Sequence, residues 1–196
     1  MLTQRARIRI KVQPGFLLLL GIIFYLEDSG STTLMVLAAA IIHEAGHVAA
    51  CALMKGKIEA LCLSAVGAEL KLTYPVMLSY GRENLVLLAG AMANLLLGMI
   101  TYFLGAYRMT GITVCLGIFN LMPAIPLDGG RILFNLISEH FSFRWSEKVL
   151  LVTSGIFAGI FAGIGIIWLV RFANILPLIL SLWLLVGILR KNTNFF

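Results

Sequence analysis

Charged residues and cysteines are both scarce in this chain. Only 12% of its 196 residues are charged and 60% are hydrophobic, whereas a soluble domain carries about 25% charged residues. This composition excludes a sizeable soluble domain and indicates a polytopic membrane protein. The three cysteines lie in apolar surroundings and are interpreted as small buried hydrophobic residues, not as a disulfide or a thiolate metal site. The net charge of +6 comes without a cluster of basic and aromatic residues, so nucleic acid is not an expected partner.

Six apolar segments approach the length of a membrane span. They cover residues 12–26, 33–54, 84–107, 111–126, 148–170 and 174–189. The first is short, about 22 Å if it is helical, and the fourth ends in proline-rich sequence. The predicted fold class is therefore an all-α polytopic membrane protein with about six transmembrane helices.

Basic residues are distributed unevenly between the loops. With six spans, all of the 15 lysines and arginines except Arg108 and Arg171 fall on the side that also holds both termini. Basic loops favour the cytoplasm, so both termini are predicted to be cytoplasmic in a multi-pass protein of the cell membrane. The lipid bilayer is thus an expected partner.

The segment between the second and third spans, about Ile58 to Tyr80, has a different pattern. From Glu69 onward polar and apolar residues alternate, which is typical of a half-buried strand, and Gly67-Ala68 breaks the preceding run. We predict a small membrane-associated β-hairpin at the cytoplasmic face. A plain interfacial loop is the alternative.

The most specific motif is His43-Glu44-Ala45-Gly46-His47, which lies inside the second apolar segment. On a helix this spacing puts two imidazoles one turn apart on the same face, an arrangement that suits zinc. The glutamate between them is placed to act as a general base on a water molecule. Ionisable groups at membrane depth are costly, so their presence predicts a functional site.

Two histidines leave a catalytic zinc site incomplete, because such a site takes three protein ligands. His140 is the only other histidine, and its place near the end of a segment favours an interfacial role. Asp128 is the better third ligand, because it follows a span broken by Pro123 and Pro126 and precedes flexible glycines. Alternatively, Asp128 caps the helix that restarts at Gly130.

Two asparagines, Asn94 and Asn120, also lie in apolar surroundings. Each could hydrogen-bond a neighbouring helix. Each could instead bind substrate, orienting the peptide or polarising its carbonyl group. The sequence leaves both interpretations open.

These motifs together resemble the site-2 protease family of intramembrane zinc metalloproteases. The resemblance rests on His43–His47 with Asp128 in Leu127–Gly130, on Gly90-x-x-x-Asn94, and on the Asn120…Pro123…Pro126 run. It covers a catalytic core of about residues 33–137. Within the family the chain is most similar to the stage IV sporulation protein FB group. We therefore expect one transmembrane metalloprotease domain over residues 1–196, with no inserted PDZ domain and no CBS domain.

The resemblance implies an enzyme that hydrolyses peptide bonds with one catalytic Zn²⁺. His43, His47 and Asp128 would be the metal ligands and Glu44 the catalytic base. In the sporulation group the substrate is the pro-form of a sigma factor, of the sigma-K type, cut on the cytoplasmic side. The protease lies in the mother-cell membrane around the forespore, where partner membrane proteins inhibit it.

Substrate binding is assigned to strand addition at Gly67, Ala68, Glu69 and Leu70, because a scissile peptide must be extended. An alternative substrate class is anti-sigma factors or signal-peptide remnants. Two alternatives lie outside proteolysis: a metal-ion transporter or channel, and an inactive relative that acts as a membrane scaffold. Lack of internal symmetry disfavours the transporter, and the intact Glu44 disfavours the scaffold.

Overall fold

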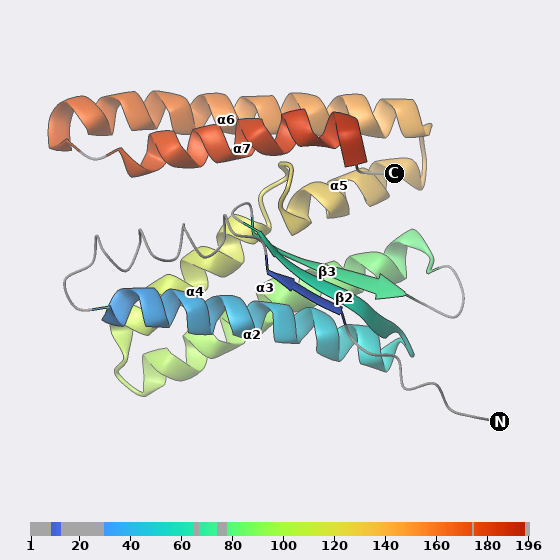
Figure 1. Ribbon diagram of the computed structural model, residues 1–196, viewed down its shortest axis with the longest axis horizontal. Coiled ribbons are helices and arrows are strands. Elements are labelled where there is room, and N and C mark those ends of the chain that lie inside the picture. The colour runs from blue at the N-terminus through green and yellow to red at the C-terminus, as the bar shows by residue number, and fades with distance from the viewer. Residues whose placement is uncertain (1–8, 13–29, 65–66, 74–77, 174, 195–196) are drawn as a thin grey trace. The chain divides into compact units, whose positions relative to one another are not determined.

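The computed structural model describes residues 9–12, 30–64, 67–73, 78–173 and 175–194. Within these residues the chain forms helices and a small sheet (Figure 1). The helices are α2 (Ser31–Leu53), α3 (Tyr80–Phe103), α4 (Tyr107–Asn120), α5 (Asp128–Ser138), α6 (Phe143–Phe172) and α7 (Leu176–Asn194). The strands are β1 (Arg9–Val12), β2 (Lys57–Ser64) and β3 (Gly67–Thr73).

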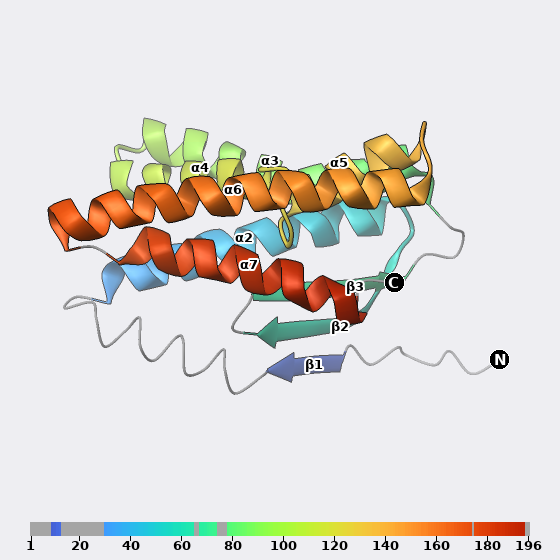
Figure 2. The ribbon, with the colours of Figure 1, turned by 90° about the horizontal axis from the view of Figure 1, so that it is seen from above.

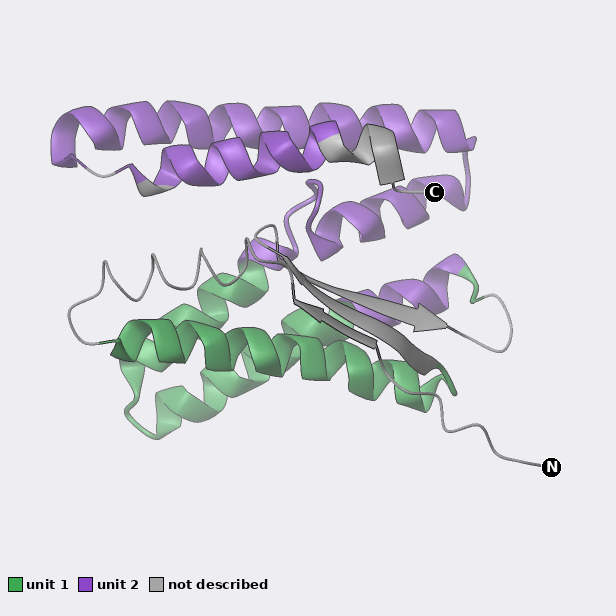
Figure 3. Cartoon of the chain, in the orientation of Figure 1, with its two compact units in different colours: residues 1–79, 88–118 green, residues 80–87, 119–196 purple. Residues whose placement is uncertain are grey.

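The chain divides into two compact units, coloured separately in Figure 3. Unit 1 comprises residues 1–79 and 88–118, and unit 2 comprises residues 80–87 and 119–196. Helix α3 is continuous across this division, so its first two turns belong to unit 2 and the remainder to unit 1.

Glycines allow the helices of unit 1 to approach one another closely. A Cβ atom at Gly46 of α2 would lie 2.5 Å from the carbonyl oxygen of Ala89 in α3. A Cβ atom at Gly98 of α3 would lie 2.6 Å from the side chain of Val114 in α4. Membrane helices associate largely by van der Waals packing, which small residues permit. Helix α3 is thereby in contact with both α2 and α4.

The sheet of unit 1 has the strand order β1-β2-β3 (Figure 2). Strand β1 pairs parallel with β2, and β2 pairs antiparallel with β3, from Lys57 opposite Thr73 to Ser64 opposite Gly67. The antiparallel pair lies in the segment for which the sequence predicts a hairpin. Its association with the membrane and with the cytoplasmic face stays a prediction.

Unit 2 contains the long helix α6 and its neighbour α7, which run side by side (Figures 1 and 2). Its buried core consists of Ala124, Leu127, Ala158 and Leu184. Two serines satisfy backbone groups within this core. Ser154 Oγ accepts a hydrogen bond from the Ile125 amide at 2.9 Å, and Ser181 Oγ donates to the Ala158 carbonyl at 2.9 Å. A backbone group without a partner would be costly at membrane depth. The first bond holds the irregular segment before α5 against α6, and the second joins α7 to α6.

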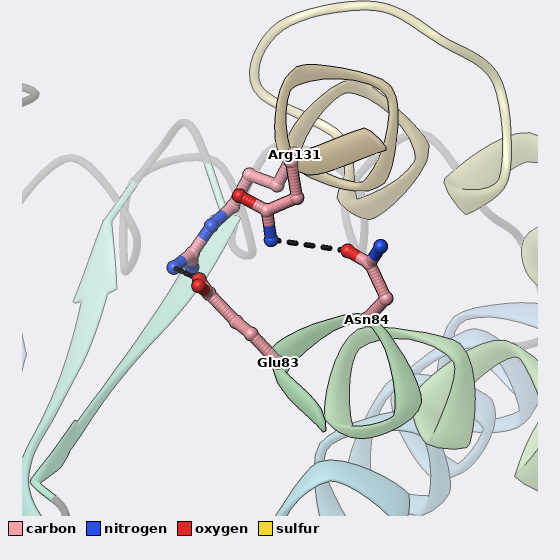
Figure 4. Close-up of polar contacts among 4 residues, drawn as sticks. Glu83, Asn84 and Arg131 are labelled. Atoms are coloured by element: carbon pink, nitrogen blue, oxygen red, sulfur yellow. Dashed lines mark hydrogen bonds and ion pairs between the residues drawn. The ribbon is translucent and has the colours of Figure 1, made fainter. Parts of the chain in front are cut away.

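The first turns of α3 are attached to α5 by two polar contacts within unit 2 (Figure 4). Asn135 Nδ2 donates a buried hydrogen bond to Asn84 Oδ1 at 3.0 Å. Arg131 Nη2 donates to Glu83 Oε1 at 3.0 Å, and this ion pair is partly exposed. The two contacts lie one and two turns into α5, so they orient the helix that begins at Asp128.

Large apolar side chains lie on the outside of the helices, as expected where lipid is the solvent. Ile41 of α2 is 67% exposed and Phe103 of α3 is 79% exposed, whereas several asparagines, serines and threonines are buried. Helices α2, α3 and α6 are long and apolar enough to cross a membrane, and α7 contains a shorter apolar stretch, Pro177–Leu189. The helices of this chain are those of a multi-pass membrane protein.

Four of the predicted segments correspond to described helices, and a fifth is wrong at its end. Segments 33–54, 84–107, 148–170 and 174–189 match α2, α3, α6 and α7 to within a few residues at most ends. The segment predicted to reach residue 126 stops at Asn120 in α4, because Pro123 disfavours helix in the residues before it. The segment predicted over 12–26 lies outside the described residues from residue 13 onward. A total of six crossings stays a prediction.

Candidate metal centre

Helix α2 presents His43 and His47 on one face, as the spacing predicts. Both are buried, with 6% exposure each, and their rings are nearly perpendicular with centroids 4.7 Å apart. The two Nε2 atoms face each other at 3.1 Å. The two lone pairs can therefore point at one position.

This geometry fits a zinc ion. Zinc–nitrogen bonds of about 2.0–2.1 Å in a tetrahedral site place two ligand nitrogens about 3.3 Å apart. The observed separation of 3.1 Å is close to that value. Imidazole nitrogens with a carboxylate oxygen are also a donor set that catalytic zinc accepts.

Asp128 provides the third donor. It is the first residue of α5, and the N-cap position belongs to Leu127, whose backbone is extended. Asp128 is therefore not the cap that the alternative interpretation requires. Its carboxylate and the ring nitrogens of His43 and His47 lie within 4.8 Å of one another, a group that could hold a metal ion.

Glu44 follows His43 directly and is half-buried on α2. One residue advances an α-helix by about 100°, so the carboxylate leaves the helix beside the histidine face, not on it. That position suits a group that acts on a molecule bound at the centre without taking up a ligand position.

Helix α3 covers the histidine pair within unit 1. A Cβ atom at Gly90 would collide with the His47 ring and would lie 2.9 Å from Cε1 of His43. One turn later, Asn94 Nδ2 lies 3.3 Å from His43 Nδ1. Asn94 thus contacts a neighbouring helix, as one of its two interpretations predicts.

The other candidate residues occupy different positions. His140 is exposed just beyond α5 and does not belong to the histidine–aspartate group. Asn120 is the last residue of α4. Gly67–Leu70 open strand β3 at the edge of the described sheet. The assignment of Asn120 and of these four residues to substrate binding stays a prediction.

Sequence reasoning overlooked the contact between Gly90 and the histidine rings, although a signal was present. Gly90 and Asn94 are four residues apart, the same spacing as His43 and His47. Residues with this spacing share one face of a helix. A second helix that presents one glycine and one amide on a single face was therefore a candidate to cover the pair.

Comparison with known proteins finds relatives among metallopeptidases. A model of peptidase family M50 matches residues 106–162. Stage IV sporulation protein FB of Bacillus subtilis is 25% identical over 187 residues, which are 91% of this chain and 62% of that protein. A zinc metalloprotease of Methanocaldococcus jannaschii is 24% identical over 160 residues, which are 72% of this chain and 46% of that protein. The chain thus spans less than two thirds of the length of either relative.

The fold has a counterpart among solved structures. The site-2 protease from Methanocaldococcus jannaschii aligns with a TM-score of 0.75 at 22% sequence identity, over 100% of this chain and 95% of that one. The chain shares this fold, and it combines apolar helices with a histidine–aspartate group that could hold a metal ion. The chain is thus similar to peptidase family M50 over residues 106–162, and in its fold it is similar to a site-2 protease.

Proposed function

We propose that this protein is an intramembrane zinc endopeptidase that cleaves a membrane-associated protein. The observation that carries the proposal is the grouping of His43, His47 and Asp128 within 4.8 Å on helices with a lipid-type exterior. His43, His47 and Asp128 would hold the metal. When bound, zinc lowers the pKa of a water molecule toward about 7 and polarises the scissile carbonyl group.

Glu44 is the proton carrier in this proposal. Its carboxylate takes a proton from the attacking water and delivers it to the leaving amine nitrogen. The carboxylate gains this proton and then loses it, so it is ionised again after each cleavage. Its half-buried position beside the histidine face supports this role.

An extended substrate segment is required, because the peptide bonds of a helix are shielded by their own hydrogen bonds. Strand β3 is at the edge of the described sheet, and its first residues, Gly67–Leu70, are proposed to pair with the substrate backbone. The Asn120 amide is proposed to orient the peptide near the scissile bond.

The substrate is proposed to approach from the cytoplasm, since the basic loops and both termini are assigned to that side. By resemblance, the substrate is a sporulation pro-sigma factor of the sigma-K type, in the mother-cell membrane around the forespore, with membrane proteins as inhibitors. Anti-sigma factors or signal-peptide remnants are the alternative substrates.

The proposal is tested with Glu44→Gln in the full chain co-expressed with a membrane-tethered pro-sigma-K-type substrate. We expect the variant to retain one zinc per chain and to lose cleavage by about 10²- to 10⁴-fold, the usual share of a general base. The matched control is Glu139→Gln, at an exposed residue beyond α5, which should cleave as wild type does.

Cleavage by Glu44→Gln at the wild-type rate would contradict the assignment of Glu44. Wild-type protein that moves zinc into liposomes and cleaves none of the three substrate classes would instead support the transporter.

A further inference from the structure

Asn94 is an amide buried completely in an apolar stretch of α3, residues 85–100. It is 0% exposed, whereas its neighbours Met92 and Leu96 are 57% and 55% exposed. A buried amide is costly unless its polar atoms are hydrogen-bonded. The contacts of the Asn94 side chain therefore indicate its role.

Only one of the two polar atoms of Asn94 has a partner within the described residues. Nδ2 lies 3.3 Å from Nδ1 of His43. Oδ1 is buried and has no hydrogen-bond partner among the residues that the structure describes. The single contact of the amide is thus with a proposed metal ligand, on the ring nitrogen opposite the one that faces His47.

The position of the ring protons determines whether this contact is favourable. The Nε2 atoms of His43 and His47 face one another, so a metal bound there takes a lone pair from each. The proton of each neutral ring must then reside on Nδ1. In that state the His43 Nδ1–H group is a hydrogen-bond donor. The Asn94 NH₂ group that faces it is also a donor, so the two cannot form a hydrogen bond.

Rotation of the Asn94 amide by 180° removes this conflict. The oxygen and nitrogen of an asparagine side chain are nearly identical in shape, and which one faces a partner follows from the hydrogen-bond network. The rotated amide presents Oδ1 to the His43 Nδ1–H group. Metal-binding histidines typically donate this second N–H group to an acceptor that fixes the tautomer and the ring orientation.

Gly90 makes the approach of α3 possible. A Cβ atom there would collide with Nε2 of His47 and lie 2.5 Å from its Cε1 atom. Gly90 and Asn94 are one turn apart on α3 and contact the two histidines that are one turn apart on α2. One face of α3 thus leaves room for the histidine rings at Gly90 and offers a hydrogen-bond acceptor one turn later, at Asn94.

We infer that Asn94 is a positioning residue of the metal centre: its Oδ1 accepts the His43 Nδ1–H bond, and Gly90 leaves space for both rings. Asn94 then selects the His43 tautomer whose Nε2 lone pair is free. This assignment rests on the proposed function only in requiring metal at the histidine pair. With its side chain fully enclosed, Asn94 acts through His43 and does not touch the substrate.

The experiment measures zinc affinity of the purified full chain in detergent, by competition with a chromogenic chelator, together with thermal unfolding of the metal-free protein. Asn94→Leu removes the acceptor, and we expect zinc to bind about 10- to 100-fold more weakly, as for other outer contacts of metal ligands. Asn94→Asp keeps an acceptor and has no NH₂ group, so it should bind zinc no more weakly than wild type.

Thr101→Val is the matched control, because Thr101 is another buried polar residue of α3 that bonds backbone carbonyls and Thr110. This variant should lower the unfolding temperature and leave zinc affinity unchanged.

Tight zinc binding by Asn94→Leu would overturn the inference. A loss of zinc affinity by tenfold or more in Asn94→Asp would also overturn it, because it would show that the NH₂ group is needed. The aspartate variant can be compared with wild type even if the leucine variant does not fold. Wild-type protein that binds no zinc would contradict the proposed function itself.

Discussion

The histidines and the aspartate of the metal centre are positioned by different kinds of structure. His43 and His47 lie on a regular helix, and the neighbouring face of α3 meets their side chains at Gly90. Asp128 follows an irregular segment, and the glycine after it meets backbone: a Cβ atom at Gly129 would lie 2.6 Å from the Met122 carbonyl oxygen. At Gly90 the close neighbours are side chains, whereas at Gly129 they are backbone atoms.

Because of this difference, substitutions in the two regions should have different effects on metal binding and on stability. A ring can rotate or shift by a few tenths of an ångström when its neighbour grows, whereas a packed backbone cannot move without its whole segment. A substitution near the histidines should therefore mainly weaken metal binding. A substitution in the segment before α5 should mainly lower the free energy of unfolding.

The largest expected effect comes from adding one methyl group in each region. Gly129→Ala should lower the free energy of unfolding by about 1–3 kcal/mol or more, as overpacking against backbone does. Gly90→Ala should lower it less, because the rings can yield, and should weaken zinc binding instead. Chemical unfolding and zinc competition on both variants measure the two effects.

The control for this pair is Gly81→Ala in the first turn of α3, where a Cβ atom would meet nothing within 4 Å. Replacing a helical glycine by alanine typically stabilises by up to about 1 kcal/mol. If Gly90→Ala unfolded as readily as Gly129→Ala and bound zinc normally, the distinction between the two regions would be lost.

A smaller effect is expected at the buried amide pair of unit 2. Asn84 and Asn135 are 7% and 4% exposed and share a 3.0 Å hydrogen bond. A double-mutant cycle with leucine at both positions should give a coupling energy of about 0.6 kcal/mol, the average measured between membrane helices, and no more than about 1.7 kcal/mol. A coupling near zero would mean that the pair does not hold α5.

The smallest effect is expected at the ion pair beside it. Arg131 and Glu83 are 3.0 Å apart, with side chains 49% and 32% exposed. Exposed ion pairs contribute about 0–1 kcal/mol and weaken with salt. Glu83→Gln should therefore change the free energy of unfolding by less than the amide variants do, and less still at high salt. A loss that exceeds theirs would reverse the ranking.

The histidine face was predictable from sequence because it depends on helix periodicity alone. Five consecutive residues set the spacing of His43 and His47, and the apolar run around them sets the helix. Asp128 could be chosen as well, since the prolines before it and the glycines after it mark an irregular segment that ends in a carboxylate.

The contacts across helices could not be predicted from the same patterns. Nothing local in the sequence says that Gly90 faces a histidine ring, or that Asn84 pairs with Asn135 fifty-one residues later. Such pairs depend on how helices dock, which follows from many weak packing contacts. The end of α4 was misjudged for a different, local reason: apolar composition continued past Asn120, whereas the helix stopped before Pro123.

The length of helix α6 can be compared with the thickness of a membrane. Its 30 residues extend about 45 Å, and Arg144 and Arg171 near its two ends are about 40 Å apart along the axis. Exposed tryptophans lie just inside each arginine, Trp145 at 62% and Trp168 at 45%, in the positions where aromatic residues meet lipid headgroups. A bilayer measures about 40–45 Å with its headgroups, so α6 is long enough to match the full thickness of a membrane.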